Sequence, residues 1–363
     1  MLQCNCNATA RARAGREEHM VLFNSDYLEG AHPRILKRLA NTNMVQTPGY
    51  GEDEYCEQAR ATIRGLCEAP DADVHFLVGG TQTNATVLSA VLRPYQGVIS
   101  ADTGHIAVHE TGAIEALGHK VIALPNRNGK VDAGQVSECC RLHFSDESHE
   151  HMVMPAALYI SNPTEVGTLY SRDELQALRA VCDRWNLILF MDGARLGYGL
   201  ASPENTLDLP FIARTCDVFY IGGTKQGLLF GEAVVIRNNV LKRDFRYLIK
   251  QKGGMLAKGR LLGLQFDEML KDGLYMELSQ YAIGLAMRLK DALKELNIPV
   301  LVDSPTNQQF PILPDVVLSI LKQKYGYATI QRVDPEHTAV RFCTSWATRE
   351  EAVDALIADL QAL

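Results

Sequence analysis

The chain lacks any apolar run long enough to cross a membrane, and it lacks an excess of positive charge. A membrane-spanning helix needs roughly 20 consecutive apolar residues, and no stretch of this sequence approaches that length. The 363 residues include 36 Lys and Arg against 43 Asp and Glu, for a net charge of -7. A mildly acidic surface disfavours nucleic acids and anionic membranes as partners. We therefore expect neither of them.

Common metal and catalytic motifs are also missing. The sequence contains no metalloprotease helix motif, no Gly-x-Ser-x-Gly elbow, and no glycine pattern of a dinucleotide fold or P-loop. The nine cysteines are scattered, and Cys4 and Cys6 have no second pair at zinc spacing. The histidines of residues 148–151 are expected in a loop of charged residues. We therefore predict no metal site, and reduced thiols in a cytoplasmic protein.

The composition is that of an ordinary globular protein, with 47% hydrophobic and 22% charged residues. This length allows one large domain or two, with a substantial core. Residues 1–20 contain arginines but no apolar core for a secretory signal, so we expect them to form a disordered tail.

From Val74 onward, short apolar segments alternate with segments of helical length. Such alternation predicts strands that pair in parallel through right-handed helical crossovers. The fold class is therefore α/β with a mostly parallel, seven-stranded sheet. The expected strands are residues 74–78, 98–100, 121–124, 157–160, 187–191, 218–221 and 233–236.

The pattern changes near Phe245, where a long helical region begins. Its leucines recur at three- and four-residue spacing up to Leu296, which is one face of a helix, and Pro299 ends it. Shorter strands around residues 300–302 and 339–342 and a helix over 350–360 follow. We predict a large domain over residues 21–250 and a smaller α+β domain over 251–363 that includes the connecting helix.

Two charged side chains of opposite sign follow two of the expected strands. Asp192 comes directly after residues 187–191, and Lys225 comes shortly after residues 218–221. Ligands bind at the carboxyl edge of open α/β sheets. Pyridoxal phosphate (PLP) requires a lysine for its Schiff base and an acid for its pyridinium nitrogen. The alternative for either residue alone is a solvated strand end, but the pair in this order favours a PLP site.

The segments FMDGARLGYG (190–199) and FYIGGTKQGLLFGEAVV (219–235) resemble the threonine aldolase and β-eliminating lyase family of fold-type-I PLP-dependent enzymes. The resemblance extends from about Phe23 to the C-terminus. It implies a PLP-binding large domain and a catalytic cleft beside the small lobe, which the N-terminal segment 21–45 joins.

The resemblance also implies roles for the residues nearest the cofactor. Lys225 would form the Schiff base, Asp192 would face the pyridine nitrogen, and His105 would stack on the ring and assist proton transfer. Asn162 would hydrogen-bond the phenolic oxygen. Glu110 follows His105 by five residues and could support it, but we expect it to be a solvated helix residue.

Gly80, Thr81 and Gln82 follow the first expected strand and open a helix. Backbone N–H groups at such a helix start attract anions, and the helix dipole adds to the effect. In the resembling family the equivalent turn holds the cofactor phosphate. Without that resemblance, an ordinary turn and helix cap would explain the same residues.

The substrate is implied to be an amino acid whose carboxylate is held by Arg195, Arg341 and Ser25. An arginine fork matches a carboxylate in bidentate geometry. Arg195 could instead form a surface ion pair, and Ser25 could equally cap a turn.

Tyr50, Lys258 and Arg260 lie in glycine-rich segments that resemble family regions reaching a neighbouring subunit's cofactor. They indicate a homodimer or homotetramer, although ordinary loop glycines would give the same pattern.

One departure from the family bears on the substrate. Threonine aldolases carry a histidine in an Asn-Thr-His-Asn segment, whereas residues 161–167 here contain none. Thr164 or Glu165 would then contact the side chain of the substrate. The predicted activity is retro-aldol cleavage of a β-hydroxy amino acid by a PLP-dependent lyase. The alternatives are a β-eliminating lyase or transaminase, and a non-catalytic binding module on the same fold.

Overall fold

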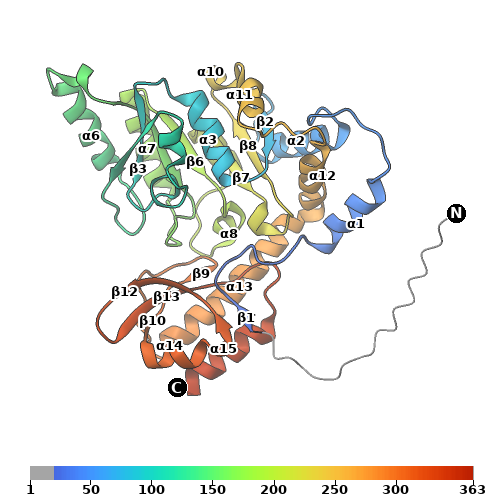
Figure 1. The fold of residues 1–363 in the computed structure, drawn as a ribbon, viewed down its shortest axis with the longest axis vertical. Helices are drawn as coiled ribbons and strands as arrows, with labels where there is room; N and C mark the ends of the chain where they lie inside the picture. Colours follow the sequence, from blue (N-terminus) through green and yellow to red (C-terminus); the bar gives the residue numbers. More distant parts are fainter. Residues whose placement is uncertain (1–19, 363) are drawn as a thin grey trace.

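The computed structural model describes residues 20–362, so the tail predicted for residues 1–20 lies, except for Met20, outside the described residues. Figure 1 shows a large lobe above a smaller one, with one long helix running between them. None of the helices within residues 20–362 is long and apolar enough to cross a bilayer.

The large lobe is built on a seven-stranded sheet in the order β2-β8-β7-β6-β5-β3-β4. β8 is antiparallel to both neighbours, and the other pairs are parallel, which confirms the predicted α/β class and the mostly parallel sheet. The strands are β2 Asp73–Leu77, β3 Gln96–Ala101, β4 Lys120–Leu124, β5 Met154–Ser161, β6 Ile188–Asp192, β7 Val218–Gly222 and β8 Glu232–Ile236.

Helices cover both faces of this sheet, in three layers (Figure 1). The helices preceding the small lobe are α1 Pro33–Thr42, α2 Glu54–Leu66, α3 Gly80–Val91, α4 His105–Val108, α5 Ala113–Ala116, α6 Ala133–Ser145, α7 Arg172–Trp185, α8 Leu196–Ala201, α9 Leu209–Thr215, α10 Asn239–Lys242, α11 Phe245–Gln251 and α12 Arg260–Met269. One apolar cluster lies against α2, α6, α7, α9 and α12, and a second lies against α3, α5 and α11.

Local sequence explains these elements. Successive residues of a strand point to opposite faces, and in β6 Leu189 and Met191 join the first cluster while Phe190 joins the second. At the start of α7, Ser171 and Glu174 form a capping box that satisfies two backbone N–H groups. β6 is thus apolar on both faces up to Met191, and its last residue, the polar Asp192, lies at the edge of the sheet.

The small lobe contains a sheet in which β13 (His337–Cys343) pairs with β9 (Gln308–Gln309), β10 (Ile312–Pro314) and β12 (Ala328–Arg332). Its helices are α14 Asp315–Leu321 and α15 Glu350–Ala362, and α13 (Leu274–Glu295) connects it to the large lobe. The prediction of a strand at residues 300–302 was wrong, because Val300 forms only an isolated bridge with Pro311.

The N-terminal residues cross to the small lobe. β1 (Val21–Leu22) pairs with β11 (Tyr325–Gly326), and the carbonyl of Phe23 accepts a hydrogen bond from Cys343. α1, in contrast, packs against α12. The two domain boundaries remain predictions, but this arrangement brings residues 24–27 to the space between the lobes.

Gly193 offers a test of how closely the strands approach beside the site. A Cβ at this position would overlap the backbone carbonyl of Tyr220 on β7. We expect Gly193→Ala to destabilise the protein by about 1–3 kcal/mol, because the overlap forces backbone to move. Urea unfolding measures this change.

Gly284 is the matched control, because it is exposed on α13 and no atom lies within 4 Å of its Cβ position. We expect Gly284→Ala to stabilise the protein by up to about 1 kcal/mol. An unchanged unfolding midpoint for Gly193→Ala would show that the two strands are not packed as described.

Candidate active site

A cavity of about 300 Å³ opens at the carboxyl edge of the parallel strands. The strands β5, β6 and β7 each contribute a residue to its wall, and β3 contributes through the segment that follows it. The predicted residues that line it are Gly80, Thr81, His105, Glu165, Asp192, Arg195 and Lys225, whereas Thr164 does not line it. Chemically distinct residues from distant parts of the sequence therefore meet in one place, as the positions of the strand ends predicted.

Lys225 lies in a short 3-10 turn, Thr224–Gln226, directly after β7. Its backbone carbonyl accepts a hydrogen bond of 2.5 Å from Tyr198, whereas its amine donates none within the described chain. Burial lowers the pKa of Lys225, and the charge of Arg195 lowers it further, against the opposing charges of nearby carboxylates. The amine of Lys225 therefore loses its proton more easily than an ordinary lysine, and a lysine must be neutral to act as a nucleophile.

Asp192, the last residue of β6, is only 5% exposed. One of its oxygens accepts a hydrogen bond from the backbone of Ala194 at 2.9 Å. The other accepts hydrogen bonds from the Tyr159 hydroxyl at 2.5 Å and from Asn84 at 3.2 Å. These donors fix the carboxylate at the cavity wall, where it can face a cationic ring nitrogen.

His105 is held from behind by a carboxylate. Its Nδ1 lies 2.8 Å from Glu110, and the same oxygen of Glu110 accepts a hydrogen bond from Asn84 at 2.7 Å. The expectation that Glu110 is solvated was wrong, because α3 covers it and its side chain is fully buried. Asn84 therefore links the His105–Glu110 pair to Asp192.

The start of α3 faces the same cavity. Gly79 provides no side-chain cap for this helix, so its first N–H groups are free to bind an anion. Gln82 does not line the cavity: its side chain accepts a hydrogen bond from Val78 and donates one to Lys252, each at 3.2 Å. It holds the turn rather than pointing into the space.

Arg195 forms a buried ion pair that the sequence did not indicate. Its Nε and Nη2 donate hydrogen bonds of 2.6 and 3.0 Å to Asp26, which is fully buried. Asn307 donates a further hydrogen bond of 2.9 Å to Asp26. The alternative of a surface ion pair does not hold, because this pair is buried, and the role of Arg195 in binding a carboxylate stays a prediction. Nη1 of Arg195 remains available to a ligand.

Burial alone would raise the pKa of Asp26. The opposing charge of Arg195, together with that of Lys225 and the hydrogen bonds it accepts, lowers the pKa instead to about 2. Asp26 is therefore ionised at every pH at which enzymes normally work.

Arg341 and Ser25 flank the cavity without lining it. Arg341 donates hydrogen bonds to Gln308 at 3.1 Å and to the carbonyl of Asn24 at 2.8 Å. The Ser25 hydroxyl is buried and has no hydrogen-bond partner in the described chain, so it does not cap a turn. Residues 24–26 thus lie between the two arginines.

Asn162 is buried but is not part of the cavity wall. Its side-chain oxygen accepts a hydrogen bond from the backbone of Tyr170 at 3.0 Å, and its own N–H donates to the carbonyl of Asp192 at 2.9 Å. Its contact with the cofactor's phenolic oxygen stays a prediction.

Two further acids line the wall: Glu165, which was predicted as a contact for the substrate side chain, and Glu232, for which the sequence motifs predicted no role. Glu165 accepts hydrogen bonds from Ser161 at 2.6 Å and from the backbone of His105 at 2.8 Å, both through Oε1. Glu232, the first residue of β8, also lines the cavity. Burial raises the pKa of Glu165 above its usual value, and burial raises that of Glu232 to about 8.

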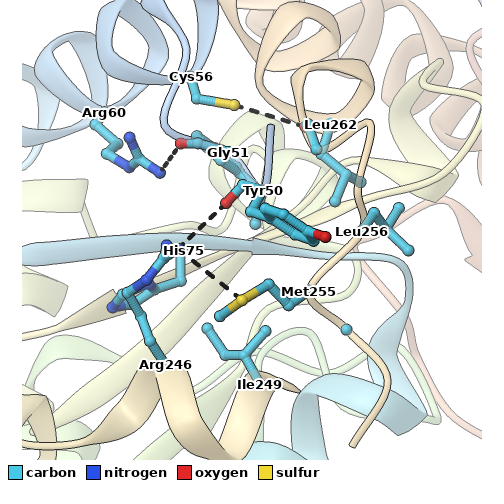
Figure 2. Close-up of a pocket in the computed structure, with 13 residues that line it drawn as sticks. Tyr50, Gly51, Cys56, Arg60, His75, Arg246, Ile249, Met255, Leu256 and Leu262 are labelled. Atoms are coloured by element: carbon cyan, nitrogen blue, oxygen red, sulfur yellow. Dashed lines mark hydrogen bonds between the residues drawn. The ribbon is translucent and has the colours of Figure 1, made fainter. Parts of the chain in front are cut away.

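Tyr50, Lys258 and Arg260 lie away from this cavity. Tyr50 borders a separate small cavity of about 30 Å³, which has room for only about one water molecule or two. Figure 2 shows Arg60 donating to the carbonyl of Gly51 and Arg246 to that of Tyr50.

Lys258 is exposed, while Arg260 is buried. The guanidinium of Arg260 donates hydrogen bonds of 2.7 Å to the carbonyls of Thr42 and Val45. The contact of these residues and Tyr50 with a neighbouring subunit, and the oligomeric state, stay predictions.

Comparisons with known proteins show which proteins the whole chain is similar to. Over 345 residues the chain is 31% identical to a low-specificity L-threonine aldolase of Pseudomonas sp. (strain NCIMB 10558), covering 94% of this chain and 97% of the relative. A low-specificity L-threonine aldolase of Pseudomonas aeruginosa is 30% identical, with 95% of this chain and 98% of the relative covered.

Solved structures show the same relationship. The structure of a Leishmania major threonine aldolase superposes with a TM-score of 0.92 at 45% identity, covering 94% of this chain and 99% of that one. A Thermus thermophilus aspartate aminotransferase mutant shares the fold alone, with a TM-score of 0.68 at 14% identity over 95% of this chain and 92% of that one. Residues 23–314 match the model of the β-eliminating lyase family. The chain therefore belongs to the β-eliminating lyase family.

Proposed function

We propose that this protein is a PLP-dependent lyase that cleaves the Cα–Cβ bond of threonine-type L-β-hydroxy amino acids to give glycine and an aldehyde. The observation that carries the proposal is that Lys225 and Asp192 share one cavity at the ends of neighbouring strands. Three relatives have threonine aldolase in their names, and each aligns with nearly all of this chain. They support the choice of reaction.

The residues present fit PLP. Lys225 offers an amine without a hydrogen-bond partner to the aldehyde, and Asp192 offers a fixed carboxylate to the ring nitrogen. Gly80 and Thr81, at the uncapped start of α3, suit the phosphate. The hydroxyl of Tyr220 is buried in the wall without a partner in the described residues, as expected of a group that binds a ligand atom. When bound, PLP supplies an electron sink for the bond cleaved at the α-carbon.

The arginines orient the substrate. Nη1 of Arg195 is the edge of its guanidinium that Asp26 leaves free, and we assign it to the substrate carboxylate. Arg341 and the unpartnered hydroxyl of Ser25 would approach the same carboxylate from the small-lobe side. Anchoring the carboxylate fixes which bond of the α-carbon lies perpendicular to the cofactor ring.

Glu165 is our candidate for the group that takes the proton from the β-hydroxyl. Ser161 and the backbone of His105 both bind its Oε1, so Oε2 is left facing the cavity. Its raised pKa brings it closer to neutrality, where a base both accepts and returns a proton. Transfer of the hydroxyl proton to Oε2 lets the C–C bond break, and the hydroxyl carbon leaves as the aldehyde.

Lys225→Ala tests the proposed activity. We expect the variant to form no covalent bond with PLP and to lose ~10³-fold or more in cleavage of L-threonine, because no other amine lies in the wall. Borohydride trapping, mass spectrometry and assays of glycine and acetaldehyde measure both effects. Lys294→Ala, at an exposed position near the end of α13, is the control and should keep both properties.

Other products would redirect the assignment. Ammonia and a keto acid would indicate β-elimination, and amino transfer to a keto acid would indicate a transaminase. If the wild-type protein bound no added PLP, the remaining interpretation would be a non-catalytic binding module.

Glu165→Gln tests the hydroxyl base. We expect kcat for threonine cleavage to fall by ~100-fold or more, since the amide cannot take up a proton. Exchange of the α-proton of glycine has no hydroxyl to deprotonate, so the same variant should retain that reaction. Equal losses in both reactions would contradict the role of Glu165, because they would indicate a general disturbance of the cavity.

Asp26→Asn tests the anchoring of Arg195. A hydrogen bond to a charged group contributes about 1.5–3 kcal/mol, so we expect KM for threonine to rise ~10-fold or more while kcat changes less. An unchanged KM would show that Arg195 does not need Asp26 to bind the carboxylate.

The same substitution should alter acid stability. Because the pKa of Asp26 is lowered from 3.8 to about 2, its stabilisation is fully present above pH 3.8 and is lost as the pH falls through about 2. In Asp26→Asn the free energy of unfolding, measured by urea unfolding at several pH values, should lack this loss between pH 3.8 and about 2.

A further inference from the structure

Glu232 reaches the cavity by an unusual route. β8 runs antiparallel to the strands beside it, so its first residue lies at the edge where the parallel strands end. The register pairs Glu232 directly with Gly222, three residues before Lys225. The side chain is only 3% exposed and belongs to the cavity wall. None of the roles assigned above uses this buried acid.

Both oxygens of Glu232 bind the turn that carries Lys225. Oε2 accepts a hydrogen bond of 3.1 Å from the backbone N–H of Gly223, and Oε1 accepts one of 2.8 Å from the Thr224 hydroxyl. The Thr224 oxygen in turn accepts a hydrogen bond of 3.0 Å from Gly231. The two residues before Lys225 are therefore fixed by one carboxyl group.

The charges around the pair come from several elements. Arg195 of the segment before α8 and Asp192 of β6 act on Lys225, as does Asp26 of the N-terminal segment. Tyr220 of β7 and Tyr275 of α13 are the nearby neutral titratable groups. Burial raises the pKa of Glu232 to about 8, although Lys225 opposes the rise. This carboxyl group therefore changes its charge near neutral pH, beside an amine whose pKa is lowered.

We propose that Glu232 is the positioning residue for Lys225, and that the charge of its carboxyl group raises the pH at which the amine becomes free to bond to the cofactor. This inference rests on the proposed attachment of PLP at Lys225. An ionised Glu232 favours the ammonium form of Lys225, which cannot attack an aldehyde. A protonated Glu232 withdraws that support and leaves the amine neutral, while its contacts with the turn keep the amine in place.

Glu232→Gln separates charge from shape, because glutamine can accept the Gly223 hydrogen bond and donate to the Thr224 oxygen. The experiment mixes cofactor-free protein with PLP over a range of pH and traps the bond to Lys225 with borohydride for mass spectrometry. The half-point is the pH at which the rate of attachment to Lys225 reaches half of its maximum. We expect the half-point of Glu232→Gln to lie about one pH unit or more below that of the wild type. In the pH range where wild-type Glu232 is ionised and Lys225 is still mostly an ammonium, attachment should be ~10-fold faster in Glu232→Gln than in the wild type. Where Glu232 is protonated, the two proteins should attach PLP at the same rate.

Thr224→Val is the matched control, because it keeps the charge of Glu232 and removes one of its two holds on the turn. We expect slower attachment at every pH with the half-point of the wild type. A half-point shifted as in Glu232→Gln would overturn the inference, since loosening of the turn would then explain the change. This variant also keeps the inference testable if Glu232→Gln does not fold, which thermal unfolding of the cofactor-free protein reveals.

The outcomes separate the two proposals. If the wild type attaches PLP at Lys225 and Glu232→Gln shows the same pH profile, the role of Glu232 is overturned and the proposed function stands. If the wild type forms no trappable bond at any pH, the proposed function fails and this inference fails with it.

Discussion

The buried ion pair between Asp26 and Arg195 connects the parts of the site that come from different lobes. Asp26 belongs to the N-terminal segment that pairs with the small lobe, Arg195 follows β6 of the large lobe, and Asn307 of the small lobe binds the same carboxylate. Removing either member of such a pair leaves an uncompensated buried charge. This one ion pair therefore contributes both to the contact between the lobes and to the charge around Lys225.

The cavity combines a rigid wall with one free nucleophile. Hydrogen bonds run from His105 through Glu110 and Asn84 to Asp192, so the groups that face the ring are fixed before any ligand enters. Lys225, in contrast, is held only through its backbone and the turn beside it. Preorganised electrostatics with a mobile amine suit a reaction in which the lysine must leave the cofactor and return.

The sequence predicted the sheet and part of the cavity wall because polar residues at strand ends are visible as breaks in apolar runs. Asp192, Lys225 and Gly80 all carry that signal. Glu110 and Asp26 carry none, since their burial arises from α3 and from the small lobe, which are distant in sequence. Glu232 was missed for a topological reason: it starts a strand, and only the antiparallel direction of β8 brings a strand start to this edge.

The charges of the cavity wall must be compatible with the anionic groups of the proposed ligands. Lys225 and Arg195 are its cations, whereas Asp192, Glu165 and Glu232 are acids. If all three acids were ionised, an anionic amino acid and a phosphate would enter a cavity that is already negative. Asp192 is the acid that a cationic ring nitrogen would neutralise. Burial raises the pKa of Glu165 and Glu232, so each can hold a proton at higher pH than an ordinary carboxyl group, and Glu165 must release its own proton before it can take that of the substrate hydroxyl. Glu165 is the acid placed to move a proton at the substrate hydroxyl, whereas Glu232 acts on Lys225 through its charge and through its hold on the turn.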